Sequence, residues 1–376
     1  MKSSKKNICF IANSDIFFES FLVRPSIELS RFFDIHIIIN SNKIQKLSKL
    51  YPNLNFYHFS IRRKKFAIVA DLSFFFKLSS FLYKKNFDFV HTFTSKVGCF
   101  SLFICYILRT KHRHHTFTGQ SWCRRNFFAW PFYKLADKSI GFFSTFTFAD
   151  SRSQSIFLID EKIITKDKIK VFANGSMCGV DLTKFYPNRL QGINIRKKLK
   201  IPQRSFVLIF VGRLCREKGI FDLINAFFVL NNKNIHLILL GMLDENIEDY
   251  FPDNRNIHFL GFKNDVTPYI NASNLLCLPS YREGFGSVVI ESAALGVPAL
   301  VSDIYGLHDS IIRNKTGLFH NPGDAIDISS KINQIISNKS FYNKMSDNAK
   351  SRAINLFNED LVIKSWINFY KKFLND

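Results

Sequence analysis

Two consecutive series of short apolar runs, separated by longer amphipathic runs, constrain the fold of this chain most strongly. A continuous apolar run such as residues 35–40 is typical of a parallel strand buried on both faces, and the amphipathic runs predict the helices that cover it. In the first series we expect strands at residues 7–12, 35–40, 56–60, 87–92, 112–116, 145–149 and 168–173, and helices at 19–32, 66–85 and 151–159.

The second series repeats the pattern, with expected strands at residues 206–211, 236–241, 257–261, 275–279 and 299–302 and a first helix at 219–230. Strand and helix alternating twice over predict an α/β protein with two doubly wound parallel sheets and a ligand site between them. We expect domains at 1–185 and 204–355, a polar linker at 186–203, and a final amphipathic helix within 356–376 that carries Trp366, Phe369 and Phe373.

Charge is distributed unevenly along the chain. Lysine and arginine total 52 against 30 aspartate and glutamate, a net charge of +22. Residues 1–200 hold 34 basic and 12 acidic residues, whereas residues 201–376 hold 18 of each. We expect an anionic partner for the first half, either a nucleic acid, a phosphate-bearing substrate or an anionic membrane surface. Nucleic acid is disfavoured because no helix-turn-helix or aromatic β-platform is legible.

The seven cysteines are widely spaced and form no Cys-x-x-Cys pair. The sequence therefore predicts neither a disulfide framework nor a zinc ribbon, and it favours a reducing cytosol. The longest apolar run, residues 97–108, is shorter than the ~18 residues of a membrane-spanning helix. We expect a protein that is soluble or rests on a membrane without crossing it.

The segment 279–287 follows a predicted buried strand and opens a helix. Gly284 and Gly286 let a ligand approach the backbone closely, and the free N–H groups at the start of the helix would hold a phosphate or a sugar oxygen. Glu283 lies in the loop and Glu291 eight residues later, up to ~12 Å away along a helix, which matches the two ends of one nucleotide-sugar. The alternative is a glycine turn before a surface helix.

The segment 212–219 also follows a predicted strand and opens a helix. Arg213 and Lys218 would then lie beside a helix N-terminus, an arrangement that suits a diphosphate and the charge it develops on leaving. The alternative is a solvated basic turn.

Gly-Arg-Leu-x-x-x-Lys-Gly at 212–219, followed by Glu-x7-Glu at 283–291, resembles the retaining glycosyltransferases of family four, which have the GT-B fold. Residues 174–181 and 316–318 also match positions of that family. The resemblance covers nearly the whole chain. It implies that Glu291 binds the ribose of the nucleotide and that the last helix crosses back onto the first domain.

The same resemblance implies that Glu283 and the amides of Phe285 and Gly286 hold the donor sugar, next to Gly284. It implies that Arg213 and Lys218 clamp the diphosphate. The expected catalytic residues are therefore Glu283, Arg213 and Lys218.

We expect no metal and no cofactor. The chain contains no Asp-x-Asp, the usual metal site of the other large glycosyltransferase fold, so Arg213 and Lys218 would neutralise the leaving diphosphate. A metal site at His112, His114 and His115 is disfavoured because no Asp, Glu or Cys ligand lies at useful spacing.

The first half departs from the commoner family pattern in two loops. Residues 12–15 lack the glycine pair often found there, and Thr118 takes the place of a family histidine. Thr-Phe-Thr-Gly-Gln at 116–120 resembles a branch found in bacterial capsule and O-antigen synthesis. We expect Asn13 and Thr118 to lie on the acceptor side, where the Thr118 hydroxyl can bond a sugar hydroxyl.

Basic runs lie beside aromatic residues, at 62–65 before 74–76 and at 124–125 before 127–132. This composition suits an interfacial membrane surface, as a polyprenyl-diphosphate-linked acceptor would require. The protein would then be cytoplasmic and peripheral at the inner face of the cytoplasmic membrane. The alternative is that these are solvated faces of a lysine-rich protein.

We therefore expect a retaining glycosyltransferase that moves a hexosyl or N-acetylhexosaminyl group from a nucleoside-diphosphate-sugar to a growing bacterial surface glycan. UDP is favoured, and GDP stays open. Same-face attack is the expected mechanism, with a covalent intermediate as the alternative. The rivals are a phosphorylase or hydrolase on a similar scaffold and a non-catalytic sugar-binding partner in a membrane assembly. A nicotinamide-dependent enzyme is disfavoured because Gly-x-Gly-x-x-Gly does not follow the first strand.

Overall fold

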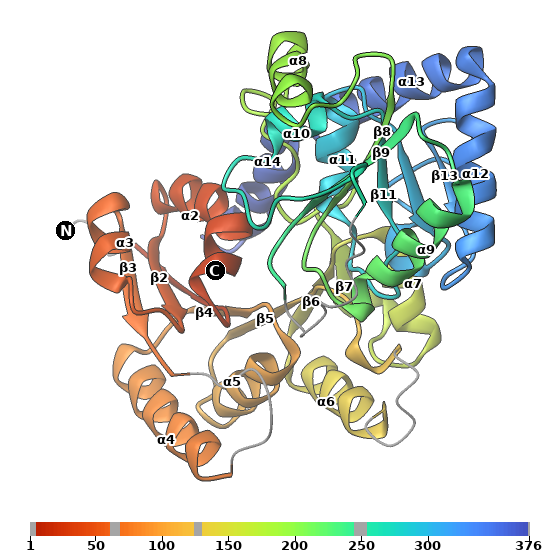
Figure 1. Ribbon diagram of the computed structural model, residues 1–376. Coiled ribbons are helices and arrows are strands. Elements are labelled where there is room, and N and C mark those ends of the chain that lie inside the picture. Colours follow the sequence, from red (N-terminus) through yellow and green to blue (C-terminus); the bar gives the residue numbers. More distant parts are fainter. Residues whose placement is uncertain (1–4, 61–67, 124–129, 244–253, 375–376) are drawn as a thin grey trace. The chain divides into compact units, whose positions relative to one another are not determined.

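The computed structural model describes residues 5–60, 68–123, 130–243 and 254–374 (Figure 1). The chain divides into two compact units, which are described one at a time. Unit 1 comprises residues 1–178 and 360–376, and unit 2 comprises residues 179–359. Unit 1 is thus built from both ends of the chain, and the division falls at 178/179 rather than at the expected 185.

Unit 1 contains a seven-stranded, entirely parallel sheet with the order β3-β2-β1-β4-β5-β6-β7. Its strands are β1 (Asn7–Ile11), β2 (Asp34–Ile39), β3 (Leu54–His58), β4 (Phe89–Thr92), β5 (His112–Phe117), β6 (Phe146–Ala149) and β7 (Ile169–Val171). Its α-helices are α1 (Asp15–Phe17), α2 (Val23–Ser30), α3 (Ile44–Leu50), α4 (Ile68–Lys85), α5 (Ser95–Ile107), α6 (Trp130–Phe143), α7 (Arg152–Asp160) and α14 (Glu359–Lys371). A π-helical turn (Phe18–Leu22) joins α1 to α2.

The sheet of unit 1 is buried on both faces, as continuous apolar strands predict. Ile8 and Phe10 of β1 pack into one core, and the alternate residues Cys9 and Ile11 pack into another. Side chains of a strand point alternately to opposite faces, so β1 lies between two layers. The layer on the Ile8 side includes α2 and α14, and the layer on the Cys9 side includes α4 and α5.

Helix α14 completes the first of these cores although it lies at the end of the chain. Trp366 and Tyr370 are fully buried, and Trp366 Nε1 donates a hydrogen bond to the Met177 carbonyl at 3.0 Å. The Trp366 ring stacks on Phe172 with centroids 4.3 Å apart. Helix α14 therefore packs within the core of unit 1. None of the helices in the described part of the chain has both the length and the apolar character needed to span a bilayer.

Unit 2 contains a six-stranded, entirely parallel sheet with the order β10-β9-β8-β11-β12-β13. Its strands are β8 (Phe206–Val211), β9 (Ile235–Leu240), β10 (Ile257–Phe259), β11 (Leu275–Leu278), β12 (Ala299–Ser302) and β13 (Gly317–His320). Its α-helices are α8 (Arg189–Lys198), α9 (Ile220–Leu230), α10 (Thr267–Asn271), α11 (Ser287–Ala294), α12 (Ala325–Ser337) and α13 (Lys339–Phe357). One core joins the helices to both faces of this sheet.

Residues 186–203, predicted to be a linker, instead belong to unit 2 and contain α8. Arg196, in this polar segment, explains its place in unit 2. Its guanidinium is buried and donates hydrogen bonds to the carbonyls of Ala272 (2.8 Å), Gln203 (3.0 Å) and Ser205 (2.9 Å) and to Asn274 Oδ1 (2.8 Å). A buried arginine that is satisfied in this way fixes the segment to the unit.

Candidate active site

The two segments singled out in the sequence follow neighbouring strands of unit 2. Residues 212–219 follow β8 and residues 279–286 follow β11, and β8 pairs directly with β11. The chain runs outward from β8 to β10 on one side and from β11 to β13 on the other, so the order of the sheet reverses at this point. Ligands of open α/β sheets bind at the carboxyl ends of the strands where the order reverses.

Glycines bring the two loops into direct backbone contact. Gly219 has φ +69°, and a Cβ there would lie 1.9 Å from the Pro279 carbonyl oxygen. A Cβ on Gly306 would lie 2.0 Å from the Glu283 carbonyl oxygen. The Tyr281 N–H donates to the Glu217 carbonyl at 3.0 Å. Only residues without a side chain allow this approach, which sets the positions of the charged groups nearby.

The charged groups of the two loops form crossed ion pairs. Lys218 Nζ lies 2.6 Å from Glu283 Oε1, and Ser280 Oγ donates to the same carboxylate oxygen at 2.7 Å. The buried Glu217 accepts hydrogen bonds from the Arg282 guanidinium. One loop has the order acid-base (Glu217-Lys218) and the other has the order base-acid (Arg282-Glu283). Glu217 can therefore pair with Arg282 while Lys218 pairs with Glu283, and both ion pairs join one loop to the other.

Arg213 adds a third cation to this group. Its guanidinium lies 3.7 Å from Glu217 Oε2, and its side chain is 48% exposed. Among the described ion pairs, three cations (Arg213, Lys218 and Arg282) are joined to two carboxylates (Glu217 and Glu283). Three cations at one edge of the sheet suit an anionic ligand such as a diphosphate.

Helix α11 begins at the same edge of the sheet. Gly286 is its N-cap in the left-handed region (φ +76°), where a Cβ would lie 2.5 Å from Leu307 Cδ2. Phe285 is buried against Phe357, with ring centroids 5.2 Å apart, and Gly284 beside it is also buried. Phe285 thus anchors the loop through its ring and leaves its backbone for other contacts. The first N–H groups of α11 have no partner within the helix and carry partial positive charge.

Glu291 lies further along α11 and is partly buried. Burial raises the pKa of its carboxyl to about 7, and the nearby Lys184 charge acts in the opposite direction. Within the described part of the chain, no hydrogen bond or ion pair joins Glu291 to the crossed ion pairs. The structure therefore joins Arg213, Lys218 and Glu283 through these contacts, and Glu291 takes no part in the described ion pairs.

The two residues expected on the acceptor side lie in unit 1, at the carboxyl edge of its sheet. Asn13 follows β1 and Thr118 follows β5, with β4 between the two strands. Asn13 Oδ1 accepts from Ser14 Oγ at 3.3 Å, and Thr118 Oγ1 lies 3.4 Å from the Phe93 carbonyl oxygen. Unit 1 reverses its strand order between β1 and β4, so Asn13 lies at the switch point of this sheet.

Three buried histidines, His91, His114 and His115, pack in the core of unit 1. Burial lowers the pKa of His91, and it lowers the pKa values of His114 and His115 to about 3, so the three rings are neutral at pH 7. His91 hydrogen-bonds to Thr116 Oγ1 at 2.7 Å and to the Tyr370 hydroxyl at 2.6 Å. Across residues 5–374, leaving out the three undescribed internal segments, no three His, Cys, Asp or Glu side chains gather as metal ligands.

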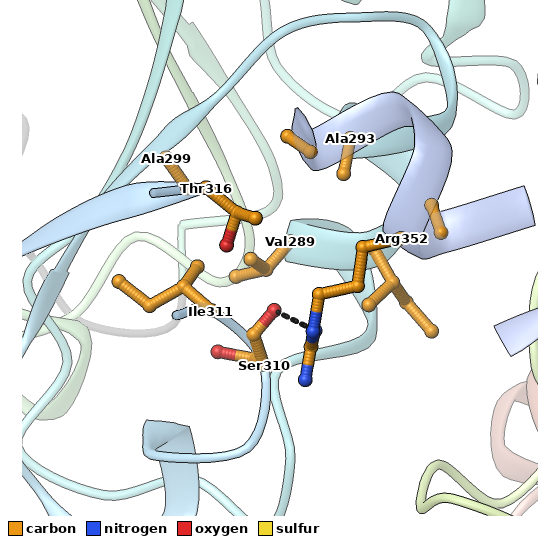
Figure 2. A pocket seen from close by; sticks show the side chains of 10 residues that line it. Val289, Ala293, Ala299, Ser310, Ile311, Thr316 and Arg352 are labelled. Carbon is orange, nitrogen blue, oxygen red and sulfur yellow. Dashed lines mark hydrogen bonds between the residues drawn. The ribbon is translucent and has the colours of Figure 1, made fainter. Parts of the chain in front are cut away.

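A small cavity lies behind α11, on the side of α13 (Figure 2). Its volume of about 10 Å³ is close to the minimum for a single water molecule. Arg352 lies at the cavity and donates a hydrogen bond to the Ser310 carbonyl at 3.0 Å. Mostly apolar side chains such as Val289 and Ile311 form the remaining wall, so the cavity is a packing defect of the core rather than a substrate site.

The sequence interpretation missed three residues of this site, Glu217, Ser280 and Arg282. Glu217 and Arg282 were read as parts of loops, although each stands next to a residue that was selected. The available signal was the reversed order of charge in Glu217-Lys218 and Arg282-Glu283. That signal gains its meaning only when the two loops are known to face each other.

Two doubly wound parallel sheets, of which the second carries this site, define the GT-B class of glycosyltransferases. Comparisons with known proteins support this class. Residues 192–352 match the family model described as Glycosyl transferases group 1. The capsular polysaccharide biosynthesis glycosyltransferase CapM of Staphylococcus aureus is 28% identical over 366 residues, which cover 94% of each chain.

A second relative is the UDP-Gal:alpha-D-GlcNAc-diphosphoundecaprenol alpha-1,3-galactosyltransferase of Escherichia coli, 26% identical over 314 residues that cover 78% of each chain. Among solved structures, Anabaena Alr3699/HepE in complex with UDP and glucose has a TM-score of 0.80 and 18% identity, covering 98% of this chain and 100% of that one. Residues 192–352 therefore match the glycosyl transferases group 1 model, and the chain is a glycosyltransferase with the GT-B fold.

Proposed function

We propose that this protein transfers a sugar, with retention of anomeric configuration, from a UDP-sugar to a polyprenyl-diphosphate-linked glycan in the assembly of a bacterial surface polysaccharide. The observation that carries the proposal is the set of crossed ion pairs, which gathers Arg213, Lys218 and Glu283 at the switch point of unit 2. The sugar-bearing diphosphate is the ligand that matches three cations, one helix N-terminus and a carboxylate at one edge.

Each residue has a distinct role in the proposed donor complex. Arg213 and Lys218, with the N-terminus of α11, hold the diphosphate and stabilise the charge that grows on it as it leaves. Glu283, already held by Lys218 and Ser280, accepts hydrogen bonds from hydroxyls of the donor sugar. Glu291 accepts hydrogen bonds from the ribose hydroxyls. The roles of Gly284, Phe285 and Gly286 are to present backbone N–H groups.

The transfer step is proposed to occur on one face of the donor sugar. Asn13 and Thr118 position the acceptor. The bond from the anomeric carbon to the β-phosphate oxygen breaks while a bond from that carbon to the acceptor oxygen forms. The acceptor's hydroxyl proton passes to the departing β-phosphate oxygen, so the products are the lengthened glycan and UDP. The reaction needs no metal in this scheme because Arg213 and Lys218 neutralise the leaving group.

The relatives support the choice of donor and acceptor. The name of the Escherichia coli relative states both a UDP-linked donor and a diphosphoundecaprenol-linked acceptor. The name of CapM states a role in capsular polysaccharide biosynthesis. We propose the same classes of substrate for this chain, with contact between unit 1 and the cytoplasmic face of the membrane that holds the acceptor. The basic runs at 62–65 and 124–125, which first suggested that contact, lie outside the described residues.

The donor is tested by thermal shift and calorimetry with UDP-, GDP-, dTDP- and CMP-sugars, followed by transfer to a polyprenyl-diphosphate-linked sugar and assignment of the new anomeric linkage by NMR. A ligand that binds only the folded state raises the melting temperature with the logarithm of its concentration. We expect UDP-sugars to give the largest shift and the product to keep the donor's anomeric configuration. A larger shift with GDP-sugars would overturn the choice of a UDP-sugar as donor. An inverted linkage would overturn the proposed retention of configuration.

The site itself is tested with Glu283→Gln, which keeps the shape of the side chain and removes its charge. We expect kcat to fall by about 10²–10³-fold, in the range for loss of one transition-state contact. The matched control is Glu161→Gln, because Glu161 also lies 2.6 Å from a lysine, Lys134, but in unit 1. We expect the control to keep wild-type kcat. A Glu283→Gln enzyme with near-normal turnover would refute the role of this carboxylate.

A further inference from the structure

We propose that a groove of unit 1, between β7 and α14, binds a water-soluble small molecule that carries a diphosphate, and that this molecule holds α14 on the sheet. We call it the basic groove because Lys170, Lys364 and Lys372 line it. Its volume is about 350 Å³, within the range of small-molecule sites. All of its lining residues belong to unit 1, so it shares none with the crossed ion pairs of unit 2.

Strand β7 forms one wall of the basic groove. Side chains alternate along a strand, so Ile169 lies on one face of the sheet, and Lys170 and Phe172 lie on opposite faces from it or on the same face as each other by the same rule. Ile169 packs with Leu158 of α7, whereas Phe172 stacks on Trp366 of α14. Lys170 therefore lies on the α14 side of the sheet, where it is exposed. The groove opens at this lysine.

Helix α14 forms the opposite wall. Lys364, Asn368 and Lys372 follow one another at intervals of four residues, so they share one side of the helix. All three are exposed, whereas Trp366 and Tyr370 on the core side are fully buried. Eight residues of helix separate the two lysines by ~12 Å along the axis. They lie towards the two ends of the groove, with the Asn368 amide between them.

Buried rings hold the two walls in place. Phe148 stacks on Phe172 with centroids 4.1 Å apart, and its centroid lies 4.8 Å from that of Phe369. All three rings are buried and line the groove from below. Ser365 Oγ of α14 also accepts a hydrogen bond from the Ala173 N–H at 3.2 Å. The shape of the groove is therefore set by packing, and a ligand would not have to order the backbone in order to bind.

The charge of the basic groove indicates an anionic ligand. Within the part of the chain that the structure describes, Lys170, Lys364 and Lys372 form no ion pair, and no described lining residue is acidic. Like charges around one groove repel each other, and a bound anion removes that repulsion. A phosphate monoester carries about two negative charges at pH 7, so three lysines suit a ligand with two phosphates better than a ligand with one. The Asn368 amide can donate to a phosphate oxygen.

A ligand in the basic groove would connect segments that are far apart in the sequence. Lys170 comes from β7, and Lys364 and Lys372 come from the last helix. If α14 left the sheet, the anion would lose its contacts with one wall. The ligand therefore binds only the state in which α14 is in place, and it favours that state by mass action. We expect slower amide hydrogen exchange in α14 when the groove is occupied.

The test is hydrogen exchange of the full chain, followed by mass spectrometry during a titration with sodium pyrophosphate and a second titration with sodium phosphate. No sugar-nucleotide or acceptor is present, so the result is separate from the transferase assay. We expect pyrophosphate to slow exchange in residues 364–372 at least threefold and to bind there at least fivefold more tightly than phosphate. Equal binding of the two anions would overturn the choice of a diphosphate.

Two variants test the residues of the basic groove. Asn368→Asp keeps the shape of the side chain and adds a negative charge between the lysines, and Lys364→Gln/Lys372→Gln removes two positive charges. Each is expected to lose at least tenfold in the affinity read from α14 protection, and to melt at the wild-type temperature without ligand. The matched control is Lys77→Gln/Lys84→Gln, which removes two exposed lysines from α4 of the same unit and is expected to bind as the wild type does.

Several outcomes would overturn the proposal. Pyrophosphate that binds only at the crossed ion pairs would protect residues 212–219 and 279–287 and leave α14 unchanged. Folded groove variants with wild-type protection of α14 would exclude these residues as ligands, and an equal loss in the control would reduce the effect to overall charge. Protection of α14 by phosphatidylglycerol vesicles and not by pyrophosphate would assign the recognised phosphate to a lipid headgroup instead.

Discussion

The Glu291 carboxyl, with a pKa of about 7, changes its charge near neutral pH. Its partly buried position disfavours the ionised form, and the nearby Lys184 offsets this only in part. A carboxylate accepts hydrogen bonds more strongly than a carboxylic acid does. The ribose binding that we propose for this residue should therefore depend on pH.

We predict that the affinity for a UDP-sugar increases by up to about tenfold between pH 6 and pH 8, because the ionised fraction of a group with a pKa of about 7 rises by that factor. Calorimetric titration with the UDP-sugar at pH 6, 7 and 8 measures this change in affinity. Glu291→Gln should bind more weakly and show a flat profile. An equally steep profile in Glu291→Gln would assign the titration to another group.

The same pKa has a consequence for stability. The folded pKa is raised above the usual glutamate value, so the folded state holds this proton more tightly than the unfolded state does. Stability from this group is thus present at low pH and is lost as pH rises through about 7. The melting temperature of the wild type relative to Glu291→Gln should decline from pH 5 to pH 8.

At the level of single residues, sequence spacing selected Arg213, Lys218 and Glu283, because motifs with glycines after apolar strands place side chains at a strand end. It did not select Glu217 and Arg282, because their partners lie 65 residues away along the chain. Pairing between distant loops depends on which strands are neighbours in the sheet. The spacing of residues within a single motif does not determine that strand order.

Among the elements, the loops after β8 and β11 depend on one close contact. Gly219 has no room for a methyl group because the Pro279 carbonyl lies 1.9 Å from the Cβ position. The contact holds the two loops at the separation that the ion pairs require.

We predict that Gly219→Ala destabilises the protein by at least ~2 kcal/mol and raises the donor KM, because the loops must separate. Gly261→Ala is the matched control, since Gly261 has nearly the same φ (+66°) and open space around its Cβ position. Its cost should be limited to backbone strain of about 1 kcal/mol. Chemical denaturation and donor kinetics of both variants give the comparison, and equal effects would contradict a special role for the loop contact.

All the strands except β13 were predicted to within a few residues because buried parallel strands are mostly apolar, as β8 is. The expected linker contains α8 and belongs to unit 2, with Arg196 buried in its contacts. The helix expected at 19–32 begins instead with a π-helical turn, and α3, α5 and α6 were not assigned. These cases share a cause, since tertiary contacts override local composition.

On the scale of the whole molecule, the stability of unit 1 depends on a helix from the far end of the chain. Trp366 is fully buried and contacts Phe10, Phe172 and His91. Removal of so large a side chain leaves a cavity as well as losing contacts.

We predict that Trp366→Ala destabilises unit 1 by about 3–5 kcal/mol while leaving unit 2 unchanged. Differential scanning calorimetry with hydrogen exchange reports which unit loses protection. Phe210→Ala, a fully buried ring in unit 2, is the reciprocal control and should weaken unit 2 alone. Equal loss of protection in both units of Trp366→Ala would contradict the division of the chain.

Unit 1 is made of the first and the last segments of the chain, with unit 2 inserted between them. Translation starts at the N-terminus, so the ribosome must finish residues 179–359 before α14 emerges. Until then one face of the first sheet, with Phe10, Phe89 and Phe148, lacks the helix that covers it. Unit 2 can fold first, while the sheet of unit 1 still exposes an aromatic surface that is prone to aggregation. A truncated nascent chain would therefore be a strong client for chaperones and proteases.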